Sequence, residues 1–270
     1  MEKGIKEYLM KKSKILENVV ENHGLSLNYA KICYCAMSIL REQTDETKEW
    51  PFHIKALYDK MGIDVKRQNL NEFMESGDVK KLNSIIGKIS IRPDYNDSSQ
   101  RKTTVYIEKD LPLSLENYAL AHELCHLILS QTEKNRKERF YTDDYCTMPM
   151  LPKQSEEMIA DAFAIFLLIP FDEFLKTFKE YIRYAKRTGS VPIRTEEWIE
   201  YLSAVSVVPY YYVACGYQQI RHLAYLIYHL YIADEAEKAR YETDYGKEVF
   251  ELYEMVKSEL TAEIIETLYQ

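Results

Sequence analysis

The amino-acid sequence lacks a long apolar run and lacks an excess of positive charge. The longest apolar stretches, at residues 162–170 and 223–233, are too short or too polar to cross a bilayer, so we expect no membrane span. Residues 1–16 alternate charged and apolar side chains, and we expect no signal peptide there. The formal net charge of −8 disfavours direct binding to nucleic acid, which needs a basic face.

The sequence also lacks a regular cysteine framework. Its five cysteines are Cys33, Cys35, Cys125, Cys146 and Cys215. An odd number without regular spacing, in a chain of 270 residues, favours reduced thiols and a cytoplasmic protein over a disulfide scaffold. The Cys33-x-Cys35 pair has the wrong spacing for a CxxC zinc site and lies in an apolar helical stretch, which favours core packing over metal binding.

The first 110 residues show a change from helical to strand patterns. Apolar residues make up 46% and charged residues 29% of the chain, which argues against disorder. Apolar side chains recur at helical spacing twice within residues 1–48, and a polar linker follows at 42–49. We then expect a short helix at 52–61, a strand at 63–65 and a β-hairpin within 85–108.

From residue 114 onward we expect helices in most of the chain. One helix covers 114–130, with Ser114 as its N-cap and Glu116 in its first turn. A second covers 155–169 and is ended by Pro170. Later helices are separated by three breaks, at residues 188–192, at Pro209 and at Gly246.

The segment Ala121–His126 contains the motif HExxH within the first of these helices. Residues four apart lie on nearly the same face of a helix, so His122 and His126 can bind one metal ion. Glu123 then lies beside the ion, where it can accept a proton from a bound water. The alternative is that both histidines are satisfied core residues and that Glu123 is solvated.

A third metal ligand is required, because a catalytic zinc site usually has three protein ligands and one open position. The next helix offers Glu157 as this ligand, with the adjacent Glu156 as a substitute. Asp161, one turn further along, can accept the free N–H of a ligating histidine, which we expect to be His122. The acids lie in an apolar helix, where they are costly unless a cation or a hydrogen-bond partner neutralises them.

These motifs resemble the ImmA/IrrE-type metallopeptidases. The resemblance lies in residues 121–129 (AHELCHLIL) and in residues 157–170, which include Ala160-Asp161, Phe163-Ala164 and Leu167-Leu168-Ile169-Pro170. It covers roughly residues 50–175. Cys125 stands where the family usually has glycine; we interpret it as a buried thiol rather than a redox-sensitive one.

The resemblance implies an α+β, mainly helical fold with a zincin-like core, in which a small antiparallel or mixed sheet lies beside two zinc-bearing helices. It divides the chain into an N-terminal helical extension (1–48), a metallopeptidase core (49–175) and a C-terminal helical region (176–270). It implies Zn2+ bound by His122, His126 and Glu157, with Glu123 as catalytic base. It further implies a regulatory protease that cleaves a transcriptional repressor, often within mobile genetic elements. The N-terminus lacks the helix-turn-helix that some members carry, so the repressor would be a separate chain.

Several points stay open at the level of sequence. The donor to the oxyanion could be Tyr141, Tyr145 or His222, and residues 105–107 or their hairpin partner could offer an edge for an extended substrate. His222 and His229 are seven residues apart but have no acid or cysteine at ligand spacing, so we interpret them as ordinary.

The alternative function is a zinc-binding, non-proteolytic interaction module that regulates a partner. It would use the tyrosine-rich residues 210–231, although such stripes more often belong to the core. The sequence does not determine the oligomeric state.

Overall fold

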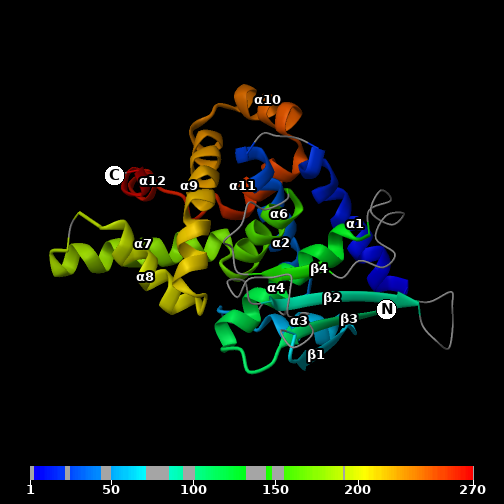
Figure 1. Ribbon diagram of the computed structural model, residues 1–270. Coiled ribbons are helices and arrows are strands. Elements are labelled where there is room, and N and C mark those ends of the chain that lie inside the picture. Colours follow the sequence, from blue (N-terminus) through cyan, green and yellow to red (C-terminus); the bar gives the residue numbers. More distant parts are fainter. Residues whose placement is uncertain are drawn as a thin grey trace.

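The computed structural model describes residues 3–21, 25–43, 50–70, 85–93, 101–131, 144–147, 155–190 and 192–269 (Figure 1). Helices make up most of these residues, and the described strands form one small mixed sheet. The expected α+β, mainly helical fold class is confirmed.

The N-terminal part forms α1 (Lys3–Glu21) and α2 (Leu25–Gln43), as the helical spacing predicted. The predicted linker at 42–49 begins later than expected, because α2 continues through Gln43, and residues 44–49 lie outside the described part. The short helix α3 (Ile54–Lys60) follows and ends before Gly62, whose positive φ of 62° suits glycine.

The sheet contains β1 (Asp64–Gln68), β2 (Ile85–Pro93), β3 (Arg101–Glu108) and β4 (Asp144–Thr147), in the order β1-β3-β2-β4. β2 and β3 form the predicted antiparallel hairpin, and its turn at 94–100 lies outside the described residues. β1 pairs with β3 in parallel, and β4 pairs with β2 in antiparallel orientation.

The expectation that residues 105–107 or their hairpin partner offer a sheet edge is wrong for β3. Val105 pairs with Val65 on one side and with Ile89 on the other, so β3 is an interior strand. β2 is interior over residues 85–89, where β4 pairs with it. Local sequence could not reveal this, because the strands that flank the hairpin, β1 beside β3 and β4 beside β2, come from segments outside it.

Helix α4 (Leu113–Leu129) lies between the sheet and α6 (Ser155–Leu168), and it contacts β2, β3 and β4 on one side and α6 on the other (Figure 1). Every residue from Glu116 to Leu129 is buried, as expected of a helix enclosed on all sides. The prediction of Ser114 as N-cap is wrong. Pro112 occupies that position, and its carbonyl accepts the Glu116 N–H at 2.9 Å. Proline suits this place because its fixed φ and missing N–H cost nothing there.

The C-terminal part contains only helices among its described residues: α7 (Phe171–Thr188), α8 (Thr195–Ser206), α9 (Tyr210–Ile232), α10 (Glu235–Tyr245), α11 (Lys247–Val256) and α12 (Ala262–Tyr269). The three predicted breaks are confirmed, and Pro170 separates α6 from α7. A further break at Asp234 was not predicted. There the side chain accepts the Glu237 N–H in a capping box.

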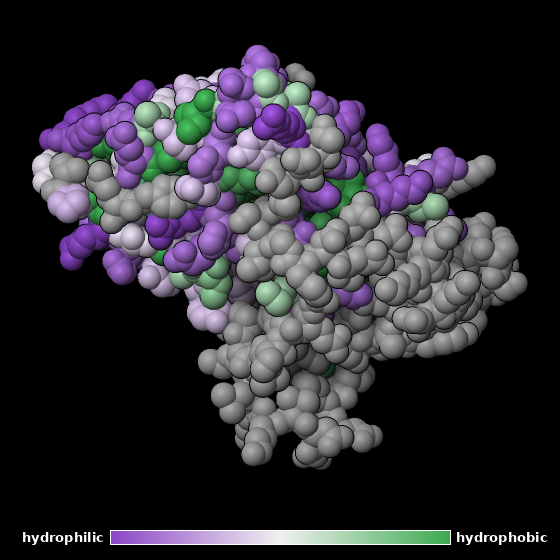
Figure 2. All heavy atoms as spheres, turned by 90° about the horizontal axis from the view of Figure 1, so that it is seen from above, coloured by the Kyte–Doolittle hydropathy of each residue, from purple (hydrophilic) through white to green (hydrophobic). Residues whose placement is uncertain are grey.

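One continuous core joins these parts. α2 packs against α6, α9 and α11 (Figure 1). α6 is therefore covered by α2 from the N-terminal part and by α9 from the C-terminal part. On the face shown in Figure 2, hydrophilic side chains cover much of the coloured surface and apolar ones are scattered among them. Within the described ranges, no helix has both the length and the apolar character that a membrane crossing would need.

Candidate metal centre

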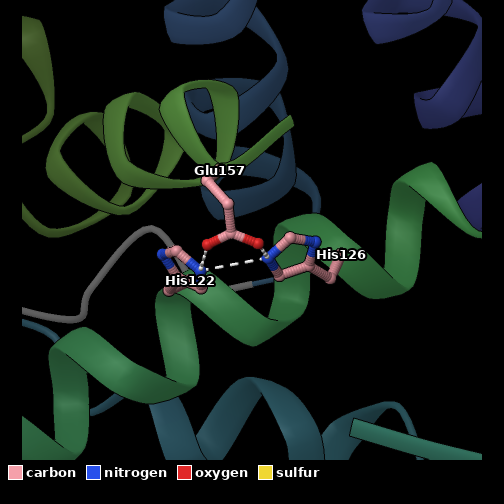
Figure 3. Close-up of side chains that lie close together, drawn as sticks. All are labelled: His122, His126 and Glu157. Carbon is pink, nitrogen blue, oxygen red and sulfur yellow. Dashed lines mark hydrogen bonds and ion pairs between the residues drawn. The ribbon is translucent and has the colours of Figure 1, made fainter. Parts of the chain in front are cut away.

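Helix α4 supplies the two histidines of the HExxH motif. His122 and His126 lie one turn apart and are almost completely buried, and their rings meet edge to face at 4.8 Å between centroids. Both Nε2 atoms point to the same place, 3.0 Å from each other (Figure 3). The interpretation of these residues as isolated core histidines is therefore disfavoured, because two imidazole nitrogens converge on one point.

Helix α6 brings Glu157 to this point. Its Oε2 lies 3.3 Å from His122 Nε2 and its Oε1 lies 3.2 Å from His126 Nε2, so the carboxylate spans both rings (Figure 3). These three side chains form a group whose ligand atoms lie within 4.8 Å of one another and could hold a metal ion. Glu156, the alternative, is not part of that group in the described residues.

The three donors fit a tetrahedral zinc ion. Two ligands at about 2.0–2.1 Å from such an ion are about 3.3 Å apart. The two Nε2 atoms lie 3.0 Å apart, and each lies 3.2–3.3 Å from a different oxygen of the Glu157 carboxylate, so these separations are nearly of this size. Two imidazoles and one carboxylate also match a donor set that zinc uses in hydrolytic sites.

The charge of Glu157 suits a cation at this place. Burial raises the pKa of its carboxyl, but the interactions with His122 and His126 lower it more, and the net pKa lies well below the ordinary value. The carboxyl is therefore ionised near neutral pH, which is the form that binds a metal.

Asp161 lies behind the first histidine. Its Oδ1 is 3.0 Å from His122 Nδ1, as expected from its place one turn after Glu157. The same oxygen accepts a hydrogen bond from the hydroxyl of Tyr118 at 2.7 Å. A carboxylate on Nδ1 leaves Nε2 of His122 directed at Glu157 and His126.

Glu123 is fully buried and lies against strand β2. A Cβ atom added at Gly87 would lie 3.1 Å from Glu123 Oε1 and 3.2 Å from its Cγ. The strand backbone therefore lies directly beside this carboxylate, and a side chain at position 87 would press on it. Sequence reasoning missed Gly87, since no local pattern links it to the HExxH helix.

The remaining candidates do not join this group. His222 and His229 lie on α9, outside the metal-binding group found in the described residues, and His229 contacts the ring of Tyr225 at 4.2 Å. Tyr141 lies outside the described part. Tyr145 pairs through its backbone with Lys88 in the sheet, and its side chain is not described.

The cysteines of the helical core match their predicted interpretation. Cys33, Cys35 and Cys125 are buried free thiols, and burial raises the pKa of Cys125 well above its ordinary value. Such a thiol reacts poorly, because the thiolate is the reactive form. Cys215 is free and exposed, and the side chain of Cys146 lies outside the described residues.

Two packed helices that carry HExxH and a following acid, with the donor atoms gathered beside a buried glutamate, form a site of the metallopeptidase class. A family model described as the IrrE N-terminal-like domain, from a peptidase family, matches residues 59–197, just over half of the chain. The chain belongs to this family, as its resemblance to the ImmA/IrrE metallopeptidases indicated. Searches of curated proteins and of solved structures found no match. The matched segment contains both site helices and ends within α8, so α1, α2 and α9–α12 lie outside it.

Proposed function

We propose that this protein is a zinc-dependent endopeptidase, in which His122, His126 and Glu157 hold Zn2+ and Glu123 is the general base. The observation that carries the proposal is the convergence of three side chains beside a buried glutamate: the two Nε2 atoms are 3.0 Å apart, and each lies 3.2–3.3 Å from one oxygen of the Glu157 carboxylate. Membership of a peptidase family supports the same reaction class.

The chemistry follows from the placement of the residues. When bound, zinc supplies Lewis acidity and lowers the pKa of a coordinated water toward neutrality. Glu123 accepts the proton of the attacking water and returns it to the leaving amine. Burial removes competing solvent from around this carboxylate, which strengthens its interaction with the water.

Substrate binding draws on the sheet. Among the described strands, the two outer ones are β1 and β4, so an extended substrate that adds as a strand would pair with one of them rather than with β3. Tyr141, Tyr145 and His222 stay candidates for the oxyanion donor.

We further propose that the substrate is a cytoplasmic regulatory protein, such as a helix-turn-helix repressor, because the resemblance to the ImmA/IrrE metallopeptidases implies such a substrate.

Replacement of Glu123 by Gln tests the proposal. We expect the Glu123→Gln variant to keep one zinc per chain, because the ligands are untouched, and to lose cleavage by a factor of at least about 100. Zinc content is measured by mass spectrometry. Cleavage is measured on a proteome-derived peptide library by mapping new termini. The control is His122→Ala, which should lose zinc and cleavage together. Undiminished cleavage by Glu123→Gln would remove Glu123 from its role.

A second candidate, a zinc-binding interaction module without proteolysis, is favoured by one observation. Tyr210, Tyr211, Tyr225 and Tyr231 on α9 are exposed, whereas Tyr212 and Tyr217 on the same helix are buried. The tyrosine-rich region is therefore part core and part surface, and tyrosine is common at protein interfaces. A wild-type protein that binds zinc but yields no new termini in the same library experiment would favour the module.

A further inference from the structure

The hydroxyl of Tyr118 connects the metal centre to a helix outside the family match. Tyr118 lies on α4, one turn before His122, and is 1% exposed. Its hydroxyl donates to Asp161 Oδ1 at 2.7 Å, and His122 Nδ1 lies 3.0 Å from the same oxygen. Asp161 is therefore held by two donors from a single helix, which limits the positions that its carboxylate can take.

The ring of Tyr118 is in turn held by α9. Tyr212, in the first turn of α9, stacks on it with 3.7 Å between centroids and 22° between planes. Tyr212 is 3% exposed, so the stacked pair lies inside the protein. The ring of Tyr212 therefore lies against one face of the Tyr118 phenol and limits its movement on that side.

The position of Tyr212 is set by a close helix contact one turn later. A Cβ added at Gly216 would lie 2.7 Å from Ile165 Cγ2, so only glycine lets α9 approach α6 this closely. Ile165 lies one turn after Asp161 on α6, just as Gly216 lies one turn after Tyr212 on α9. Two consecutive turns of α9 thus make contacts near the site. Tyr212 stacks on Tyr118, and Gly216 lies against Ile165 of α6.

We propose that Tyr118 is a positioning residue of the metal centre, and that α9 keeps it in place through Tyr212. Tyr118 fixes the Asp161 carboxylate, Asp161 orients the His122 ring, and His122 then presents Nε2 to the metal. Partners of this kind behind a metal ligand commonly change metal affinity when they are replaced. The inference rests on the proposed function, since it assigns the metal to His122, His126 and Glu157. The inference adds that α9, which lies beyond the family match that ends at residue 197, helps to position a metal ligand.

The test measures metal binding rather than proteolysis. The Tyr118→Phe variant keeps the ring and the stacking but loses the hydroxyl. We expect its zinc affinity, measured by competition with a chromogenic chelator, to fall about tenfold. With Co2+ in place of zinc, we expect the visible absorption bands of the variant to shift, because the His122 ligand is held less tightly. Asp161→Asn should weaken zinc at least as much.

The contribution of α9 is tested with Tyr212→Leu, which removes the stacked ring and keeps an apolar side chain. We expect a smaller loss of affinity than for Tyr118→Phe. The double variant should lose no more than Tyr118→Phe alone, because Tyr212 acts through the Tyr118 hydroxyl. Tyr212→Leu also keeps the proposal testable if Tyr118→Phe fails to fold.

The matched control is Tyr58→Phe. Tyr58 is equally buried and also donates to α4, but to the Leu120 carbonyl at 2.8 Å rather than to Asp161. We expect this variant to lose stability without a change in zinc affinity or in the Co2+ spectrum. Wild-type zinc affinity and spectrum in both Tyr118→Phe and Tyr212→Leu would overturn the inference and leave the proposed function standing. A wild-type protein that binds no zinc would instead overturn the proposed function.

Discussion

At the scale of single residues, the site depends on contacts that local sequence partly encodes. The spacing of His122 and His126 and the following Glu157 were predicted, because a helix repeats every 3.6 residues and places residues four apart on one face. Tyr118 stands at the same spacing before His122 and could have been found in this way. Gly87 could not, since its importance arises only where β2 meets α4.

The Gly87→Ala variant tests whether the close approach of β2 to Glu123 matters for catalysis. The new methyl group would lie 3.1 Å from Glu123 Oε1 and 3.4 Å from the Cβ of Ala119, so Glu123 must shift by a few tenths of an ångström. We expect kcat to fall about threefold to tenfold, since small misplacements of a catalytic group are costly, while zinc content is unchanged. Gly4→Ala is the control, because nothing lies within 4 Å of its added Cβ. Equal kcat for Gly87→Ala and wild type would show that Glu123 tolerates the displacement.

At the scale of elements, polar contacts fix how helices from opposite ends of the chain pack. The half-buried Tyr34 of α2 donates a hydrogen bond to Glu251 of α11. Burial, and then this hydrogen bond, raises the pKa of Tyr34. The pKa of Glu251 is lowered, first by Lys247 and then by Tyr34. The helices themselves were predictable from their apolar spacing, but this pairing joins residues more than 200 positions apart.

Tyr34→Phe should therefore destabilise the protein in a pH-dependent way. Near neutral pH we expect a loss of about 1 kcal/mol in the free energy of unfolding, because the contact is only partly buried. The contribution of Glu251 is present above its ordinary pKa and is lost as pH falls through the lowered one. The contribution of Tyr34 is present below its ordinary pKa and is lost as pH rises through the raised one.

Urea unfolding of wild type and Tyr34→Phe between pH 3 and pH 9 measures this difference. It should be constant from about pH 5.5 to pH 9 and should shrink toward pH 3, as Glu251 becomes protonated. A difference that is the same at pH 3 and pH 7 would contradict the assignment.

At the scale of the whole molecule, one hydrophobic core connects all three predicted segments. Cys35, Leu127 and Leu223 belong to it, although they come from the N-terminal extension, the metallopeptidase core and the C-terminal region. The Trp50 indole N–H also donates to the Leu168 carbonyl at 2.8 Å, which joins residues before α3 to the end of α6. The division of the chain at residues 48 and 175 stays a prediction, but side chains from all three segments pack in the same hydrophobic core.

We therefore expect the fragment of residues 49–175 not to fold cooperatively by itself. It would expose the faces of α6 that α2 and α9 cover in the full chain. Burial of apolar area is the main driving force of folding, so the loss of these faces should exceed the small net stability of a domain. Circular dichroism with urea titration would show a broad, non-cooperative transition for the fragment and a sharp one for the full chain. A sharp transition in the fragment would show that the core folds independently.

Most of the helices, the hairpin and the donor residues could be predicted because each depends on the spacing of neighbouring residues. The N-cap of α4 was missed by two residues, since serine and proline compete as start signals there and the carbonyl of Pro112 accepted the first bond. The interior position of β3 was also missed, because β1, which pairs with it on the side away from the hairpin, comes from a segment that no local pattern connects to the hairpin.

The sequence by itself determined that two imidazoles share one helical face and that an acid pair follows on the next helix. Helical periodicity is a local property, so these statements needed no fold. Only the tertiary structure decided that α4 and α6 bring these groups within 3.3 Å of one another, that β2 approaches Glu123, and that Tyr212 stacks on Tyr118. Contacts between residues far apart in the chain follow from the packing of the entire core, and no short segment carries that information.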